Sequence, residues 1–166
     1  YQEAVQQPDA LLAEPQFYGA TVAQTRRGLP LAYTGRFAVV FRLTAKDNTQ
    51  WALRCFTSSP EGEAMRHLRY EKLRPYLTHP TIADLFVPYR YMGDGIRVGK
   101  QCYPALLMGW AQGEPLGAFV EKNRNNPAAL LTLAATLSDA QARFSAAGIA
   151  HGDWQHDNLL ISDGGR

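Results

Sequence analysis

The sequence predicts an α+β fold, in which a mostly antiparallel sheet with one inserted helix is followed by a helical region. Two observations carry this prediction. Short runs of β-branched and aromatic residues, separated by turn sequences, fill residues 31–110. Beyond them the apolar residues take helical spacing, most clearly over Pro127–Ala147. The chain has 166 residues, which fits one domain or a part of a larger one.

Two strands at Ala38–Leu43 and Gln50–Phe56 are expected to form a hairpin, because "AKDN" between them supplies turn residues. A further strand before Gly35 would complete a three-stranded meander. Residues 1–30 have little pattern, and only a short helix around Gln2–Ala13 is expected there.

A helix is expected after the hairpin. Ser58 and Glu61 have the spacing of a capping box, and Pro75 should end the helix near Arg74. More strands should follow, with "GDG" as the turn between the first two. These strands are expected at Phe86–Tyr91, Ile96–Val98 and Tyr103–Trp110.

The second half is expected to be helical after the connector "AQGEPLG", starting with a short helix at Leu116–Asn123. The long helix should begin at Pro127 and end at Gly148. A short strand at Leu159–Ser162 and the tight turn "SDGG" come last, and this turn should lead into a partner strand. The expected divisions are an N-terminal extension (1–30), a sheet-rich lobe (31–110), a hinge (111–117) and a partial helical lobe (118–166).

Composition argues against several classes of protein. The net charge of +2 gives no reason to expect nucleic acid or an anionic membrane as a partner. Cys55 and Cys102 lie in strand-like runs and are expected to be buried free thiols, which fits a reducing, cytoplasmic environment. No apolar stretch approaches the roughly 20 residues of a membrane span, and the polar N-terminus shows no secretory signal.

The stretch "HGDWQHDN" follows the long helix and precedes the last apolar strand. It places His151, Asp153 and Asn158 in the spacing H-x-D-x-x-x-x-N. Together with the sheet, the connector and the helical region, this motif resembles the protein-kinase-like fold family over roughly residues 31–166. The H-G-D form resembles atypical bacterial serine/threonine protein kinase-related proteins, and also small-molecule kinases similar to aminoglycoside phosphotransferases.

The resemblance implies binding of ATP and Mg²⁺ and transfer of the γ-phosphoryl group to a hydroxyl of a protein or a small molecule. By this resemblance Asp153 is the catalytic base, Asn158 is a metal ligand, and His151 supports the loop. His156 or Asp157 would be the next candidates for contact with the acceptor. An alternative is a transition-metal site built from His151, Asp153, His156 and Asp157, which is disfavoured because no second ligand cluster appears in the sequence.

The same resemblance implies which residues form the nucleotide site. "WALR" resembles the strand that ends in the phosphate-binding cation, which places Arg54 in that role, with Glu71 of the following helix as its inward-facing partner beside Ala64 and Leu68. Arg54 and Glu71 are also compatible with a purely structural ion pair. The other nucleotide-binding positions that the resemblance implies are Gly35, Phe37, Val40, Ala52, Met108, Gly109 and Ala111.

Several positions depart from the family pattern. Arg54 replaces the usual lysine, only Gly35 remains of the glycine-rich loop, and Gly152 replaces the arginine of the catalytic loop. The second metal-binding aspartate of the family would fall just beyond Arg166. A pseudokinase, acting as a scaffold or nucleotide-sensing module, is therefore the second hypothesis, and the chain by itself is expected to transfer phosphate poorly. The long helix should expose apolar residues and favour self-association.

Overall fold

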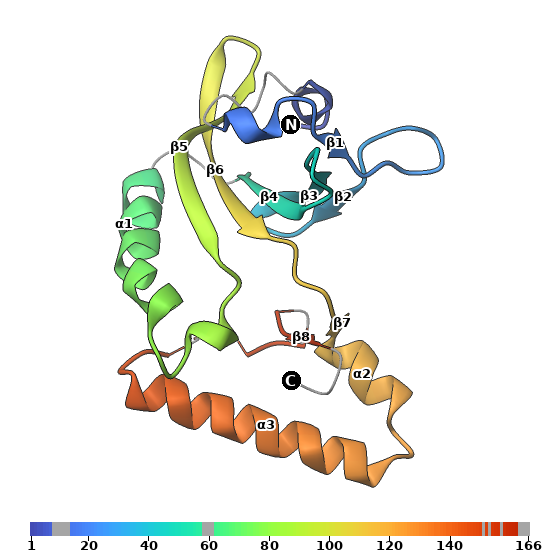
Figure 1. Cartoon of the computed structure of the whole chain (residues 1–166), viewed down its shortest axis with the longest axis vertical. Coiled ribbons are helices and arrows are strands. Elements are labelled where there is room, and N and C mark those ends of the chain that lie inside the picture. Colours follow the sequence, from blue (N-terminus) through green and yellow to red (C-terminus); the bar gives the residue numbers. More distant parts are fainter. Residues whose placement is uncertain (8–13, 58–61, 151, 153, 157, 163–166) are drawn as a thin grey trace. The chain divides into compact units, whose positions relative to one another are not determined.

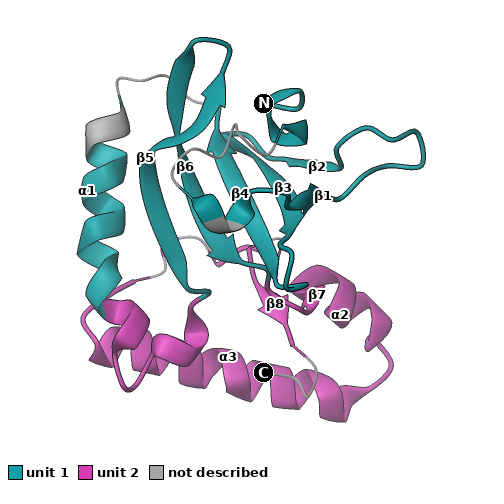
Figure 2. Ribbon diagram, turned by 45° about the horizontal axis from the view of Figure 1, so that its top comes forward, with its two compact units in different colours: residues 1–75, 87–110 teal, residues 76–86, 111–166 magenta. Residues whose placement is uncertain are grey.

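The computed structural model describes residues 1–7, 14–57, 62–150, 152, 154–156 and 158–162. Figure 1 labels the helices and strands of the chain, which divides into two compact units (Figure 2). Unit 1 comprises Tyr1–Pro75 and Val87–Trp110, and unit 2 comprises Tyr76–Phe86 and Ala111–Arg166.

Unit 1 is built on an antiparallel sheet with the order β1-β3-β4-β6-β5, in which β2 also pairs with β3. The predicted hairpin and the strand before Gly35 are both confirmed. At the hairpin turn, Asn48 takes a left-handed φ of 66° and the Thr49 N–H donates to the Asp47 carboxylate at 2.9 Å. The strands are β1 (Thr21–Val22), β2 (Ala32–Thr34), β3 (Ala38–Thr44), β4 (Gln50–Phe56), β5 (Tyr89–Val98) and β6 (Gln101–Gly109).

One face of this sheet carries the main apolar core. Alternate residues of β3, among them Val39 and Phe41, point into it and meet Leu53 and Leu107 of the neighbouring strands. Burial raises the pKa of the Cys55 thiol in this core to about 12, so that it stays protonated at neutral pH. The expectation that both cysteines are buried is wrong for the other one, since Cys102 is exposed.

The two strands predicted around "GDG" are one strand, β5, and the predicted turn there is wrong. β5 pairs with β6 on both sides of this stretch, with a register shift between Met92 and Ile96. Gly95 faces β6 so closely that a Cβ on it would lie 2.6 Å from the Ala105 Cβ and 2.9 Å from the Ala105 nitrogen. Gly95 therefore allows a close approach of the two strands, and the chain reverses later, at Gly99, where φ is 62°.

Helix α1 (Glu63–Leu73) follows the hairpin, and its end agrees with the prediction. The predicted capping residues Ser58 and Glu61 lie outside the described residues. A 3₁₀ turn continues over Arg74–Thr78.

The N-terminal residues belong to unit 1. They form 3₁₀ turns at Ala4–Gln6 and Pro15–Phe17, and Val5 and Phe17 are buried in the main core. The buried carboxylate of Glu14 forms an ion pair with Arg90 of β5. Residues that we expected to form an extension therefore complete the packing of the sheet.

Unit 2 contains α2 (Leu116–Lys122), α3 (Pro127–Ala146), a 3₁₀ turn at Ala83–Leu85, and two short strands. The predicted long helix is confirmed as α3. The Asn126 side chain accepts a hydrogen bond from the Ala129 N–H at 3.2 Å at its start, and Gly148 follows its end with a φ of 73°. Leu133, Ala140 and Phe144 are its buried residues.

The predicted last strand is confirmed as β8 (Leu160–Ile161), which pairs antiparallel with β7 (Glu114–Pro115). Residues 163–166, the rest of the predicted turn, lie outside the described residues. None of the described helices is both long enough and apolar enough to span a bilayer.

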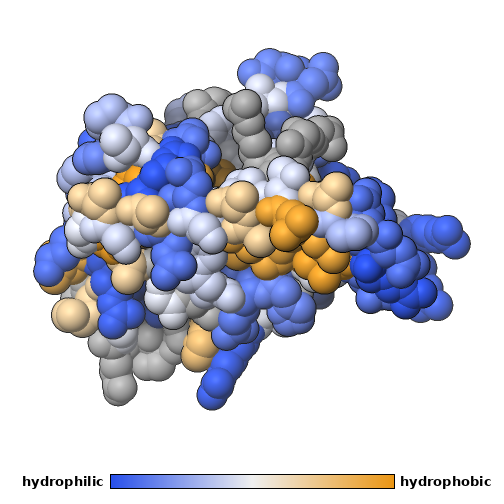
Figure 3. Space-filling view, turned by 90° about the horizontal axis from the view of Figure 1, so that it is seen from below, coloured by the Kyte–Doolittle hydropathy of each residue, from blue (hydrophilic) through white to orange (hydrophobic). Residues whose placement is uncertain are grey.

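Exposed apolar side chains remain in unit 2, of which Leu131 on α3 is the most exposed at 72%. Figure 3 shows one face of the chain, on which hydrophobic residues gather near the middle with hydrophilic residues around them.

Candidate functional site

The candidate nucleotide face is the side of the unit 1 sheet opposite the main core. Because Val39 and Phe41 point into that core, Val40 between them points to the other side. Val40 pairs with Arg54, and Ala52 pairs with Met108. Residues directly opposite in an antiparallel pair share a face, as do residues two apart in a strand. The register therefore brings Val40, Ala52, Arg54 and Met108, four of the predicted nucleotide residues, onto one surface.

Arg54 lies in the middle of this face, between Val40 and Leu106 of the neighbouring strands. Its Nε atom is buried and has no hydrogen-bond partner among the described residues. A buried donor without a partner is costly, and more so when it belongs to a charged group. The position is therefore suited to an anion, which would supply both the hydrogen-bond acceptor and the counter-charge.

The expectation that Glu71 faces inward is wrong. Its side chain is 48% exposed and lies near two residues of its own helical segment, 3.8 Å from the His67 Nε2 and 3.7 Å from an Arg74 nitrogen. Leu68, expected beside it, is also exposed, and the Ala64 side chain lies outside what the structure describes. No ion pair between Arg54 and Glu71 is present among the described contacts.

Tyr70 of α1 turns toward the sheet, as does His67, whose ring stacks on that of Tyr91 at 5.0 Å. The Tyr70 ring lies 5.3 Å from the ring of Tyr89, 5.7 Å from that of Tyr91 and 6.3 Å from that of Phe56. The Tyr89 hydroxyl also donates to the Tyr70 carbonyl at 2.9 Å. Successive residues of an α-helix are about 100° apart around its axis, so a helix with Tyr70 inward turns Glu71 aside. The sequence contained a signal for this contact, because aromatic residues occur in α1 and in the strands before and after it. They are Phe56, Tyr70, Tyr89 and Tyr91.

The turn between β2 and β3 replaces the predicted glycine-rich loop. The Gly35 N–H donates to the Ala38 carbonyl at 2.9 Å, and the Thr57 N–H donates to the Phe37 carbonyl at 3.0 Å. Phe37 is exposed at the tip, with the Arg36 guanidinium 5.2 Å from its ring centre. A Cβ on Gly35 would meet only the Ala38 carbonyl oxygen, at an ordinary 3.6 Å. Steric need does not explain this glycine.

The end of β6, which was predicted to contact adenine, is hydrogen-bonded to neighbouring segments. The Gly109 N–H donates to the Pro88 carbonyl at 3.0 Å, and the Trp110 N–H donates to the Gln50 carbonyl at 3.1 Å. The Trp110 ring lies 5.6 Å from the Tyr33 ring, and the Arg42 guanidinium lies 5.3 Å from the Trp110 ring centre. Ala111, the last predicted adenine contact, belongs to unit 2 and is half-buried.

In unit 2, the predicted catalytic loop is described at Gly152, Trp154–His156 and Asn158, while His151, Asp153 and Asp157 lie outside the described residues. The Trp154 ring contacts the Phe144 ring of α3 at 6.0 Å, and the Asn158 N–H donates to the Gln155 carbonyl at 2.9 Å. Within the described part of the chain, no three His, Cys, Asp or Glu residues are placed to hold a metal ion. Three of the four residues of the alternative metal site, His151, Asp153 and Asp157, lie outside the described residues, so the structure does not test that site.

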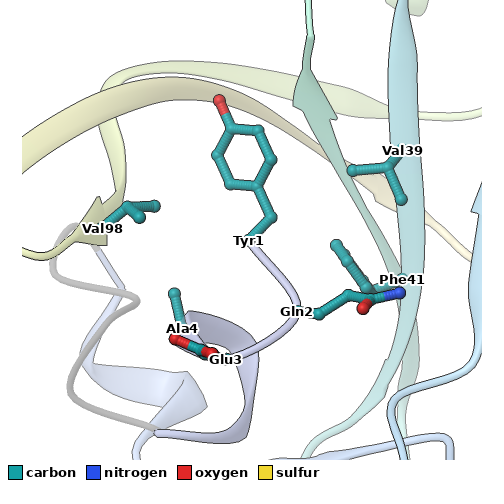
Figure 4. A pocket seen from close by; sticks show the side chains of 7 residues that line it. All are labelled: Tyr1, Gln2, Glu3, Ala4, Val39, Phe41 and Val98. Atoms are coloured by element: carbon teal, nitrogen blue, oxygen red, sulfur yellow. The ribbon is translucent and has the colours of Figure 1, made fainter.

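A pocket of about 410 Å³ lies on the main-core side of the sheet (Figure 4). Val39 and Phe41 contribute to it, so it opens on the side of β3 opposite Val40 and Arg54. It is separate from the candidate nucleotide face. Its lining residues are Tyr1, Gln2, Glu3, Ala4, Val39, Phe41 and Val98.

Comparison with known proteins supports the fold. No family model matches the sequence, and no curated protein matches it. The kinase domain of maize SIRK1, a sucrose-induced receptor kinase bound to AMP-PNP, is similar with a TM-score of 0.50 and 14% sequence identity, over 93% of this chain and 49% of that domain. Vaccinia related kinase 3 is similar with a TM-score of 0.49 and 15% identity, over 97% of this chain and 51% of that protein.

The chain is thus structurally similar to a protein kinase domain over most of its length and spans about half the length of that domain. Its α+β fold is that of the sheet-rich part of such a domain, followed by helices, as the sequence predicted.

Proposed function

We propose that the chain is the nucleotide-binding part of a kinase-like phosphotransferase that uses Mg-ATP. The observation that carries the proposal is the buried, unpartnered Nε of Arg54 on the face that also holds Val40, Ala52 and Met108. Apolar residues around a cation with a buried donor suit a flat base next to a phosphate chain. In this proposal Arg54 binds a phosphate oxygen, while Val40, Ala52 and Met108 contact the base.

The distribution of charge supports a phosphate ligand in unit 1 and a metal ligand in unit 2. Unit 1 has 13 basic and 8 acidic side chains, whereas unit 2 has 4 basic and 7 acidic ones. A basic surface attracts a polyphosphate, and an acidic one attracts the cation that accompanies it. The overall charge of +2 conceals this division.

The proposed reaction assigns one task to each loop residue. Asp153 accepts the proton of the acceptor hydroxyl, whose oxygen forms a bond to the γ-phosphorus while the bond from that phosphorus to the bridging oxygen breaks and ADP leaves. Asn158 offers its side-chain oxygen to Mg²⁺, which neutralises phosphate charge when it is bound. His151 is proposed to support the loop. The acceptor is a hydroxyl of a protein or of a small molecule.

Calorimetric titration with Mg-ATP tests the nucleotide site. Arg54→Gln should weaken binding roughly 10- to 100-fold, the equivalent of the ~1.5–3 kcal/mol of hydrogen bonds to a charged group. Arg97→Gln, which removes an exposed arginine from β5 of the same unit, should leave the affinity unchanged. Absence of binding at millimolar nucleotide, or equal affinities of the two variants, overturns the proposal. A gain in affinity for Arg54→Lys would show that Arg54 occupies a site that suits a lysine better.

A nucleotide-binding pseudokinase is the second candidate, and the outward position of Glu71 favours it. Both candidates predict binding, so they differ only in phosphate transfer. Transfer is best measured on the longest natural form of the protein that contains this sequence. Transfer that Asp153→Asn abolishes while Mg-ATP binding persists identifies a kinase, and transfer that survives this change removes Asp153 as the base. Binding without any transfer identifies the pseudokinase.

A further inference from the structure

We propose that His156 is a positioning residue for Asn158, and that the residue at position 117 must be glycine so that the His156 ring can rest on helix α2. This inference takes from the proposed function only the role of Asn158 as a metal ligand. The contact itself lies entirely within unit 2 and is testable without any ligand.

Gly117 is the second residue of α2, and the His156 ring covers it. A Cβ at this position would lie 3.1 Å from the His156 Cδ2, 3.5 Å from its Cβ and 3.6 Å from its Cγ. Gly117 is not among the glycines with positive φ, so its backbone conformation is open to other residues. Glycine is a poor helix former relative to alanine. Space for the imidazole is therefore the physical reason that the structure offers for a glycine here.

Asn158 lies between two contacts that the loop makes with the first turn of α2. Before it in the chain, His156 rests on Gly117. After it, the Leu159 carbonyl accepts a hydrogen bond from the Leu116 N–H at 3.0 Å. The turn that contains His156 is itself closed by the Asn158 N–H, which donates to the Gln155 carbonyl. Adjacent residues of one helix therefore hold the loop on both sides of Asn158.

The start of the loop is held by an aromatic contact with α3. The buried Phe144 ring lies edge-to-face with Trp154 at 6.0 Å and with Phe86 at 5.5 Å. Arg143, next to Phe144, donates to the Thr81 carbonyl at 2.6 Å and forms an ion pair with Asp84. The Phe144 contact fixes one end of the loop, so a change at Gly117 acts on the segment that includes Asn158.

The affinity for Mg²⁺ is therefore predicted to depend on Gly117, a residue that touches neither the metal nor the substrate. Residues that orient a metal ligand typically affect metal affinity 10- to 100-fold when they are changed. A larger side chain at position 117 displaces His156 and with it the turn that ends at Asn158. The affinity for Mg²⁺ should fall, while the part of nucleotide binding that depends on unit 1 should not.

The first measurement is independent of ligands. Gly117→Val should move the backbone amide resonance of Asn158 in a ¹⁵N-labelled sample of the full chain. Ala118→Val adds the same side chain at the next, exposed position of α2 and serves as the matched control, which should leave that resonance in place. An Asn158 resonance that responds equally to both variants, or to neither, overturns the positioning role whether or not the protein binds ATP.

The second measurement is a double-variant cycle on Mg²⁺ affinity at fixed nucleotide concentration. Gly117→Val and His156→Ala should each weaken Mg²⁺ binding roughly 10-fold. The double variant should bind Mg²⁺ no more weakly than either single variant, because without the imidazole ring the valine at position 117 displaces nothing. ATP binding in the presence of EDTA should change less than about twofold in all three variants, which separates positioning from general loss of structure. Additive losses overturn the inference. A wild-type chain that binds no nucleotide contradicts the proposed function, and the resonance measurement then decides this inference by itself.

Discussion

Unit 1 and unit 2 position their candidate site residues by different means. In unit 1, hydrogen-bonded strand register places Val40, Arg54 and Met108 on one face, and the register is fixed along seven residue pairs between β3 and β4. In unit 2, the two described strands have two residues each, and the loop residues Trp154 and His156, near Asn158, contact α3 and α2 through their side chains. The candidate site residues of unit 1 should therefore tolerate surface changes, whereas those of unit 2 should respond to the loss of single contacts.

The largest effect is expected from a cavity in the main core of unit 1, which packs against the strands that carry the candidate site residues. Phe41→Ala removes a fully buried ring from β3 and should lower the free energy of unfolding by about 4 kcal/mol. Phe37→Ala, on an exposed ring four residues earlier, should cost less than about 0.5 kcal/mol. Urea denaturation followed by circular dichroism measures both. Similar losses for the two variants would mean that unit 1 lacks a packed core.

A second test concerns the irregular part of β5. Gly95→Ala brings a Cβ into the backbone of Ala105 and should destabilise the chain by about 2 kcal/mol. Gly93→Ala is the matched control, because nothing lies within 4 Å of a Cβ there. Thermal unfolding of the two variants gives the comparison. A neutral Gly95→Ala would show that β5 and β6 do not approach so closely.

The third prediction addresses the exposed surface of unit 2. Self-association is expected through the apolar residues of α3, and Leu131→Lys should weaken it roughly 10-fold, which corresponds to ~1.4 kcal/mol of lost apolar burial. Leu29→Lys changes a similarly exposed leucine of unit 1 and should have no effect. Sedimentation velocity over a range of concentrations separates the variants. A wild-type chain that is monomeric at every concentration contradicts this prediction.

The smallest effect is expected for Glu71. Its ion pairs are exposed, so Glu71→Gln should change the free energy of unfolding by less than about 0.5 kcal/mol. ATP affinity should change less than about twofold, because Tyr70 occupies the inward position on the helix. Calorimetry checks this value beside Arg54→Gln. A tenfold loss of affinity would mean that α1 turns when nucleotide binds and delivers Glu71 to Arg54.

The sequence was sufficient for elements whose periodicity is regular. The hairpin of β3 and β4, the end of α1 and the helix α3 all follow from spacing, caps and turn residues, which act locally. The prediction from sequence failed at "GDG", because glycine favours a turn in isolation but also permits close strand contact in a sheet. Only the partner strand decides between these two outcomes.

Which candidate residues share a face was predictable where strand register alone decides it, and less so where packing does. Val40, Ala52, Arg54 and Met108 share a face because strand alternation is strict. Glu71 was misplaced because the rotation of α1 is set by Tyr70 and the tyrosines of β5, which lie far along the chain. Gly117 and Phe144 were missed as supports for the loop, since no local pattern connects them with residues 154–158.

The irregular stretch of β5 also bears on how the protein behaves at high concentration. β5 is the last strand in the sheet order and has ten residues, long enough to offer free backbone groups to a strand of another molecule. The register shift and the exposed Asp94 within it interrupt that template and place a charge where a neighbouring strand would have to dock. A regular, uncharged sequence in this place would leave the internal sheet intact and make the chain prone to aggregate.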